Sequence, residues 1–336
     1  MTYPKCCRSV FLKRFVHLSA TAACVAFATA VTAQGSDAEQ NPVMVGLTTG
    51  SEVATWTLLP EKPVHKTPVV FLHGGPGMYT TPGAMNNGAL LRTAGFTTVY
   101  FDQAGSGKSK RLSARDYTID RAVADLEALR VTSGRDKVIL WGNSYGASLA
   151  TVYAARYPDR IAGIILTSPG SYPGTQAKRD YKTTNRGKID LSAAVSAAAN
   201  KIDKLGATAE GKLTQDEAGA LFDGVVNVDL MGAMVCKGAK LTVPPPGKGG
   251  NLYANRMIAK DLDRLKFRAT TAFNIPALIL RGSCDFMPES NAADYAKLFK
   301  TSVTTLPQTG HGLLENTSAI NSTFSAFVVG PLASVE

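Results

Sequence analysis

The sequence predicts an α/β fold in which a mainly parallel central sheet is flanked by helices. Short apolar runs alternate with segments of helical periodicity along most of the 336 residues, and turn-forming residues separate them. One long segment lacks this alternation and predicts a mostly helical cap inserted after the sixth strand. The runs expected to be strands are 53–59, 68–72, 97–101, 137–141, 161–167, 277–280 and 302–306, with an antiparallel hairpin over 44–59.

The helices and domain limits follow from the same patterns. Apolar residues recur every three or four positions over 119–130, which predicts a helix there, and a second helix is expected from Ser144 to about Tyr157. Within the cap, helical patterns cover 191–204 and 214–223. We expect two core parts separated by the cap, with limits of 34–170, 171–274 and 275–336.

A candidate nucleophile follows the apolar run at 137–141. That run leads into Gly142–Asn143–Ser144–Tyr145–Gly146 and then into a helix rich in small residues. A serine hydroxyl becomes a useful nucleophile when a sharp strand-to-helix turn projects it toward a base, and flanking glycines keep that turn free of side chains. The alternative is a chance match in a glycine-containing loop. The strand before it and the helix after it favour Ser144 as the nucleophile.

Such chemistry also needs backbone N–H groups to stabilise an oxyanion. The residue after the nucleophile, Tyr145, begins a helix and supplies one donor. The second is expected from Gly75 in the sequence His-Gly-Gly-Pro-Gly at 73–77, where a glycine pair lets the backbone approach a substrate closely. A plain β-turn is the alternative for this loop.

The chain has four histidines from which to choose a general base. His17 lies in an N-terminal segment expected to be removed, and His65 in a proline-flanked stretch expected to be an exposed turn. His73 precedes the nucleophile and is expected to shape the glycine-rich loop. His311 follows the predicted strand at 302–306 and remains as the base that accepts and returns the serine proton.

The orienting acid is expected at Asp285. In the chain order Ser, acid, His, it lies between nucleophile and base, directly after the buried-strand pattern at 277–280. A carboxylate there fixes the histidine tautomer and stabilises the imidazolium. An Asp in a turn can also be a local backbone cap, which is the alternative.

Several of these segments together resemble the proline iminopeptidases, a family of α/β-hydrolase fold serine hydrolases. The resemblance is carried by residues 73–77, 102–109, 142–146, 281–285 and 310–311. It implies an α/β-hydrolase fold and an acyl-enzyme mechanism that removes an N-terminal residue, often proline, from short peptides. Residue by residue, Ser144, Asp285 and His311 take the positions of the family's catalytic triad.

Two positions depart from the family pattern and leave the substrate open. Ala104 stands where the family usually has Arg, and Tyr145 where it usually has Trp. The same triad cleaves esters and amides, so an esterase or amidase acting on a small acyl substrate is the alternative enzyme. A non-catalytic binding protein built on this fold is the third reading, although all three triad positions are filled.

Substrate choice is expected to reside in the cap. Its carboxylates are candidates to bind a substrate ammonium group, although each has a structural explanation of its own. Thr214 and Glu217, for example, form a capping-box pattern. The acidic residues considered are Glu210, Asp216, Glu217, Asp223 and Asp229.

The first 33 residues predict a cleavable signal peptide. Four basic residues precede an apolar stretch at 15–30 and a small-residue site that ends at Ala33. The stretch is too short and too rich in Ala and Thr for a typical membrane anchor, and a lipoprotein site at Cys24 is a weaker alternative. We therefore expect a periplasmic or secreted protein with no stable membrane span after processing.

Removal of that segment lowers the formal charge from +10 to +6, because it contains four basic and no acidic residues. The remaining charge forms no basic tract, which gives no support for nucleic-acid binding. No metal-ligand spacing or cofactor loop is convincing, so no metal and no cofactor are expected and the partner is a small molecule or short peptide. Cys236 and Cys284 remain, either as a disulfide joining cap to core or as two free thiols.

Overall fold

The computed structural model describes residues 41–174, 191–209, 211–241, 247–267 and 273–335. The predicted signal peptide at 1–33 and the cap residue Glu210 lie outside these residues. The limits proposed for the core and cap stay a prediction.

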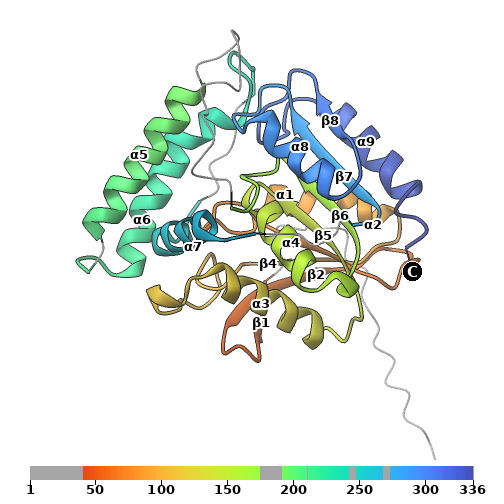
Figure 1. Cartoon of the computed structure of the whole chain (residues 1–336), viewed down its shortest axis with the longest axis horizontal. Coiled ribbons are helices and arrows are strands. Elements are labelled where there is room, and N and C mark those ends of the chain that lie inside the picture. The colour runs from red at the N-terminus through yellow and green to blue at the C-terminus, as the bar shows by residue number, and fades with distance from the viewer. Residues whose placement is uncertain (1–40, 175–190, 210, 242–246, 268–272, 336) are drawn as a thin grey trace, which may run out of the picture. The chain divides into compact units, whose positions relative to one another are not determined.

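Eight strands form one sheet in the order β1-β2-β4-β3-β5-β6-β7-β8 (Figure 1). β1 pairs with β2, and β2 with β4, in antiparallel fashion, whereas the pairs from β4 to β8 are parallel. The prediction of a mainly parallel sheet with an N-terminal hairpin is confirmed. The strands are β1 (Val43–Gly46), β2 (Glu52–Leu58), β3 (Val69–Leu72), β4 (Thr98–Phe101), β5 (Val138–Asn143), β6 (Ile161–Thr167), β7 (Ala277–Gly282) and β8 (Val303–Leu306).

Helices cover both faces of the sheet, because successive side chains of its buried strands point to opposite faces. In β5, Val138 and Leu140 pack with α3 (Ile119–Thr132), α4 (Tyr145–Arg156) and α8 (Glu289–Leu298). Ile139 and Trp141 pack on the other face with α1 (Pro82–Asn87), α2 (Ala89–Thr93) and α9 (Thr317–Val329). The near-continuous apolar runs of the sequence therefore become strands buried on both sides.

Among the described residues between β6 and β7, where the sequence predicts the helical cap, the structure has three α-helices. They are α5 (Leu191–Ala209), α6 (Gln215–Val225) and α7 (Leu252–Arg264). A small apolar cluster holds them together, with Phe222 and Leu252 among its buried members. No helix in the described part of the chain is long and apolar enough to cross a membrane.

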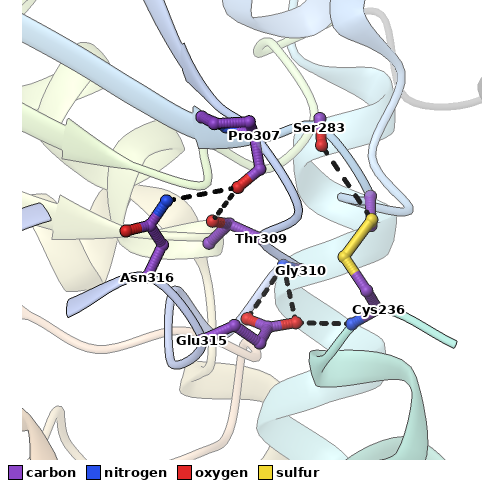
Figure 2. The surroundings of a disulfide bond; sticks show 8 residues. Cys236, Ser283, Pro307, Thr309, Gly310, Glu315 and Asn316 are labelled. Atoms are coloured by element: carbon purple, nitrogen blue, oxygen red, sulfur yellow. Dashed lines mark hydrogen bonds between the residues drawn. A yellow bond between two sulfur atoms is a disulfide. The ribbon is translucent and has the colours of Figure 1, made fainter. Parts of the chain in front are cut away.

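A disulfide joins Cys236, which follows α6, to Cys284, which follows β7. Their Cα atoms are 5.4 Å apart, within the range that a disulfide spans. Of the two alternatives left by the sequence, the structure has the cross-link, and Figure 2 shows its surroundings.

One departure from the sequence expectations concerns the side chain of His65. The side chain is half-buried, and its ring stacks on Phe96 with a centroid distance of 3.7 Å. It also makes a 3.3 Å hydrogen bond with the Val335 carbonyl. The stretch around His65 is mostly exposed, as expected, but the C-terminal segment and Phe96 partly cover the His65 side chain itself.

The disulfide is expected to stabilise the fold measurably. Replacing Cys236 and Cys284 together by Ser should lower the free energy of unfolding by about 2–4 kcal/mol, because the link closes a long loop in the unfolded chain (sequence separation 48). Urea denaturation of the oxidised wild type and the variant measures the difference. Addition of a thiol reductant should destabilise the wild type and leave the variant unchanged. Equal transition midpoints for the oxidised wild type and the variant would contradict the expectation.

Candidate active site

Ser144, Asp285 and His311 follow the ends of β5, β7 and β8 respectively. These strands run parallel in the order β5-β6-β7-β8, so all three residues lie at the same edge of the sheet. The structure brings Asp285 and His311 into direct contact, with 2.7 Å between Asp285 Oδ1 and His311 Nδ1. Both side chains are buried, Asp285 being 1% and His311 4% exposed.

Ser144 occupies a strained turn between β5 and α4. Its φ of 52° and ψ of −119° lie in a region that costs a non-glycine residue about 1–3 kcal/mol. The turn is also too crowded for side chains at its flanks. A Cβ on Gly142 would lie 2.5 Å from the Gly146 carbonyl oxygen, and one on Gly146 would lie 2.0 Å from the Leu72 oxygen. The sequence pattern of two glycines around Ser144 is thus a steric requirement.

The glycine-rich loop at 73–77 lies against this turn. A Cβ on Gly74 would come within 3.1 Å of the Ser144 Cβ, and Gly75 has a φ of 115°, which favours glycine. The cap holds the far side of the loop: Asn251 N donates to the Gly77 carbonyl at 2.8 Å and Asn255 Nδ2 to the Pro76 carbonyl at 2.9 Å. The backbone of this loop is therefore fixed beside the candidate nucleophile.

His73 is a structural residue of the same loop. Its Nε2 accepts a 2.9 Å hydrogen bond from Gln103 N, so its Nδ1 carries the proton and donates to the Gly74 carbonyl at 3.0 Å. Burial lowers the pKa of His73 to about 4. A neutral ring with both nitrogens engaged cannot serve as the base, in agreement with its expected loop-shaping role.

Asp285 has two roles in the structure. Besides the bond to His311, its Oδ1 accepts a 2.8 Å hydrogen bond from Met287 N, which closes a local turn. The two sequence interpretations, a turn cap and a histidine partner, are therefore both found in one carboxylate. The ring of Phe286 stacks on the His311 imidazole with a centroid distance of 4.1 Å, which restricts its rotation further.

Asp102 is a buried carboxylate whose role the sequence does not reveal. It accepts 2.8 Å hydrogen bonds from the backbone N–H groups of Thr80 and Lys108. Burial outweighs these bonds and raises the pKa of Asp102 to about 6. It joins the segment after the glycine-rich loop to the segment after β4. Gly107 packs against this carboxylate so closely that a Cβ there would overlap Asp102 Oδ2. This close packing identifies the structural role of Asp102, and it is visible only in the folded chain.

The described acidic residues proposed for ammonium binding all have partners within the chain. Asp216 pairs with Arg111 at 3.1 Å, and Asp229 with Lys201 at 2.6 Å. Glu217 closes the predicted capping box with Thr214. Asp223 accepts hydrogen bonds from the backbone N–H groups of Gly249 and Gly250, both at 2.9 Å.

A cavity of about 430 Å³ is lined mostly by cap residues, among them Leu213, Tyr253 and Arg256, and also by Ala114 of the segment between β4 and α3. Ser144, Asp285 and His311 are not among its lining residues. The cavity is therefore separate from the sheet edge that carries these three residues. Over the described residues, no group of three or more His, Cys, Asp or Glu side chains has an arrangement that could hold a metal ion.

The comparison with protein families decides the fold family. Residues 67–316 match the family of the α/β hydrolase fold. The chain belongs to this family. It is also similar to proline iminopeptidases, with 40% identity over 105 residues to that of Saccharolobus solfataricus and 37% over 103 residues to that of Thermoplasma volcanium.

These alignments are partial. Each covers 30% of this chain, together with 32% of the Saccharolobus and 34% of the Thermoplasma protein. The chain thus spans about a third of the length of the curated relatives it matches. Among solved structures, an epoxide hydrolase variant from Bacillus megaterium has a TM-score of 0.61 and 19% identity, covering 85% of this chain and 100% of that one. That likeness shows the fold alone.

Because His73 is buried, we predict that the stability of the fold depends on pH. The pKa of His73 in the folded protein, about 4, lies below the ordinary value of 6.5. Protonation of His73 is therefore less favourable in the folded than in the unfolded protein. This difference makes the free energy of unfolding up to about 3 kcal/mol larger above pH 6.5 than below pH 4, and the gain is lost as the pH falls from 6.5 toward 4. An NMR titration, with the His73 signals assigned through His73→Gln, should show a neutral ring down to about pH 5. A midpoint near 6.5 would contradict the burial argument.

Proposed function

We propose that this hydrolase uses Ser144 as nucleophile, His311 as general base and Asp285 as the orienting acid, through an acyl-enzyme. The observation that carries the proposal is the 2.7 Å contact between Asp285 and His311, at the sheet edge where the strained turn presents Ser144. This combination of a buried carboxylate–imidazole pair and a serine at a strand-to-helix turn suits acyl transfer.

The proton positions follow from the contacts. Because Asp285 accepts the Nδ1 proton of His311, the opposite nitrogen, Nε2, is the acceptor for the Ser144 hydroxyl proton. As Ser144 Oγ attacks the substrate carbonyl carbon, that proton passes to Nε2, and the buried Asp285 carboxylate stabilises the resulting imidazolium. His311 then returns the proton to the leaving group as the scissile bond breaks.

The negative charge that develops on the carbonyl oxygen requires donors. In this proposal they are the N–H of Tyr145, at the first position of α4, and the N–H of Gly75 in the loop that packs beside Ser144. Both belong to backbone that the surrounding packing fixes, so the donors need not reorganise during the reaction. Water activated by His311 then hydrolyses the acyl-enzyme by the same steps in reverse order.

For the substrate, we propose an aminopeptidase that releases N-terminal residues, including proline, from short peptides. The partial similarity to proline iminopeptidases, over 103 and 105 residues, supports it. The resemblance carried by residues 73–77 and 142–146 points the same way. A second candidate, an esterase or amidase on a small acyl substrate, is favoured by the cap itself. The four described residues that the sequence offers as ammonium ligands, Asp216, Glu217, Asp223 and Asp229, already have partners within the chain.

The location of the enzyme is the third part of the proposal. The signal peptide expected at 1–33 directs it to the periplasm or the exterior, and the mature chain then begins at or near Gln34. N-terminal sequencing of protein from the native host measures this. A first residue of Met1 or Thr2 would refute export by cleavage.

The nucleophile is tested by Ser144→Ala. This variant should retain the fold but lose turnover by several orders of magnitude and resist labelling by a fluorophosphonate probe, since only binding and oxyanion stabilisation remain. Ser148→Ala, in the same helix but hydrogen-bonded to the Ser171 carbonyl, is the matched serine control and should still be labelled. Retention of more than about a tenth of wild-type kcat by Ser144→Ala, a barrier difference of only about 1.4 kcal/mol, would exclude this nucleophile.

The substrate class is tested with a free and an N-acetylated prolyl arylamide. An aminopeptidase should prefer the free amine by about tenfold or more in kcat/KM, because acetylation removes the charge that the site reads and costs on the order of a few kcal/mol in a dry site. Short-chain p-nitrophenyl esters serve as the comparison substrates. Equal values for the two arylamides, or activity on esters alone, would select the esterase and leave the triad proposal intact.

A further inference from the structure

The disulfide lies next to the catalytic acid in the chain. Cys284 directly precedes Asp285, and its partner Cys236 belongs to the segment between α6 and α7. This segment packs tightly on the loop that carries the base. A Cβ on Gly310 would lie 2.5 Å from the Met234 carbonyl oxygen, and Gly312 N donates to that oxygen at 2.7 Å.

The carboxylate of Glu315 bridges the same two segments (Figure 2). Its Oε1 accepts a 2.5 Å hydrogen bond from Cys236 N. Its two oxygens also accept from Gly310 N, at 3.1 and 3.0 Å. Hydrogen bonds from backbone N–H groups to an ionised carboxylate are stronger than those between neutral groups. Glu315 therefore connects the half-cystine of the cap with the residue directly before His311.

These contacts form a closed ring around the acid–base pair. Three links are covalent, namely the disulfide and the two peptide bonds Cys284–Asp285 and Gly310–His311, and the other three are hydrogen bonds. The order around the ring is Asp285, Cys284, the disulfide, Cys236, the Glu315 carboxylate, Gly310, His311 and, through the 2.7 Å bond, Asp285 again.

We propose that Glu315 is a positioning residue for the Asp285–His311 pair, acting through this disulfide-closed ring. The proposal rests on the proposed function, in which those two residues are the acid and the base. The turn after β7 and the loop after β8 are also joined directly, by Cys284 N donating to the Thr309 carbonyl at 2.9 Å. The ring adds a second connection between these two loops, which runs through Cys236 of the cap and Glu315. The position of the cap and the geometry of the Asp285–His311 pair therefore depend on each other.

The first test separates positioning from general stability. Glu315→Ala removes the acceptor and should lower kcat roughly 10- to 100-fold, the cost of a small displacement of catalytic groups, while KM changes less than about threefold. Glu315→Gln keeps an acceptor oxygen and should restore most of the activity. Glu289→Ala, at the exposed start of α8, is the matched control and should leave kcat unchanged.

The second test asks whether Glu315 and the disulfide act through one ring. In a cycle with Cys236→Ser plus Cys284→Ser, the combined variant should lose no more kcat than the more damaging of the two changes alone, because either one opens the ring. Near-UV circular dichroism confirms that each variant is folded. Fully multiplicative losses, or a wild-type kcat in Glu315→Ala, would overturn the proposal.

A third measurement does not require activity. The Nδ1 proton of His311, hydrogen-bonded to a buried carboxylate, should give a downfield NMR resonance, assigned by its absence in His311→Ala. This resonance should broaden or disappear in Glu315→Ala and persist in Glu315→Gln and Glu289→Ala. Unchanged resonance in Glu315→Ala refutes the ring, whereas an inactive wild type that shows the expected pattern refutes only the proposed function.

Discussion

The structure depends most on the hydrogen bond between Asp285 and His311. A carboxylate and an imidazole that are each at least 95% removed from solvent are costly unless they satisfy one another. The fold makes the contact by ending two adjacent parallel strands, β7 and β8, at one edge of the sheet. The turn bond from Met287 N and the Phe286 ring then limit how each partner can move.

The surroundings of Ser144, the proposed nucleophile, are organised by backbone packing rather than by charge. Gly142 and Gly146 permit a turn that no other residue fits, and the loop at 73–77 is fixed by His73 beneath it and by Asn251 and Asn255 of the cap. The cap therefore contacts both halves of the site. Asn251 contacts the glycine-rich loop, and Cys236 is linked to the loops that carry Asp285 and His311.

Much of this arrangement follows from the sequence, because it depends on local periodicity and chain order. The buried strands, the helix after Ser144 and the order of Ser144, Asp285 and His311 along the chain require no knowledge of contacts. The sequence alone leaves the disulfide open, since whether two distant cysteines meet depends on their separation in the folded chain, here 5.4 Å between Cα atoms. His65 was expected to be exposed because neither Phe96 nor the C-terminal segment is near it in sequence.

Carboxylates that bind backbone N–H groups were the least predictable. Asp102, Asp223 and Glu315 each accept such hydrogen bonds from segments remote in the chain. The spacing of residues along the sequence does not indicate which carboxylate will accept a hydrogen bond from a distant backbone N–H group. The acidic residues of the cap had been considered as ligands for a substrate. In the structure these residues contact the start of a helix, the backbone of a glycine-containing loop and two basic side chains. Such contacts stabilise the fold, and the sequence pattern alone does not distinguish an acidic residue with this role from one that binds a substrate.

The most direct test of the central claim is the effect of Asp285→Asn on kcat. An Asn side chain keeps the shape of the turn but removes the charge that stabilises the imidazolium and orients the His311 tautomer. Our account predicts a folded protein whose kcat on any accepted substrate falls roughly 10³- to 10⁴-fold. A folded Asp285→Asn variant with kcat within about tenfold of the wild type would show that this hydrogen bond is structural and that another group serves as the acid.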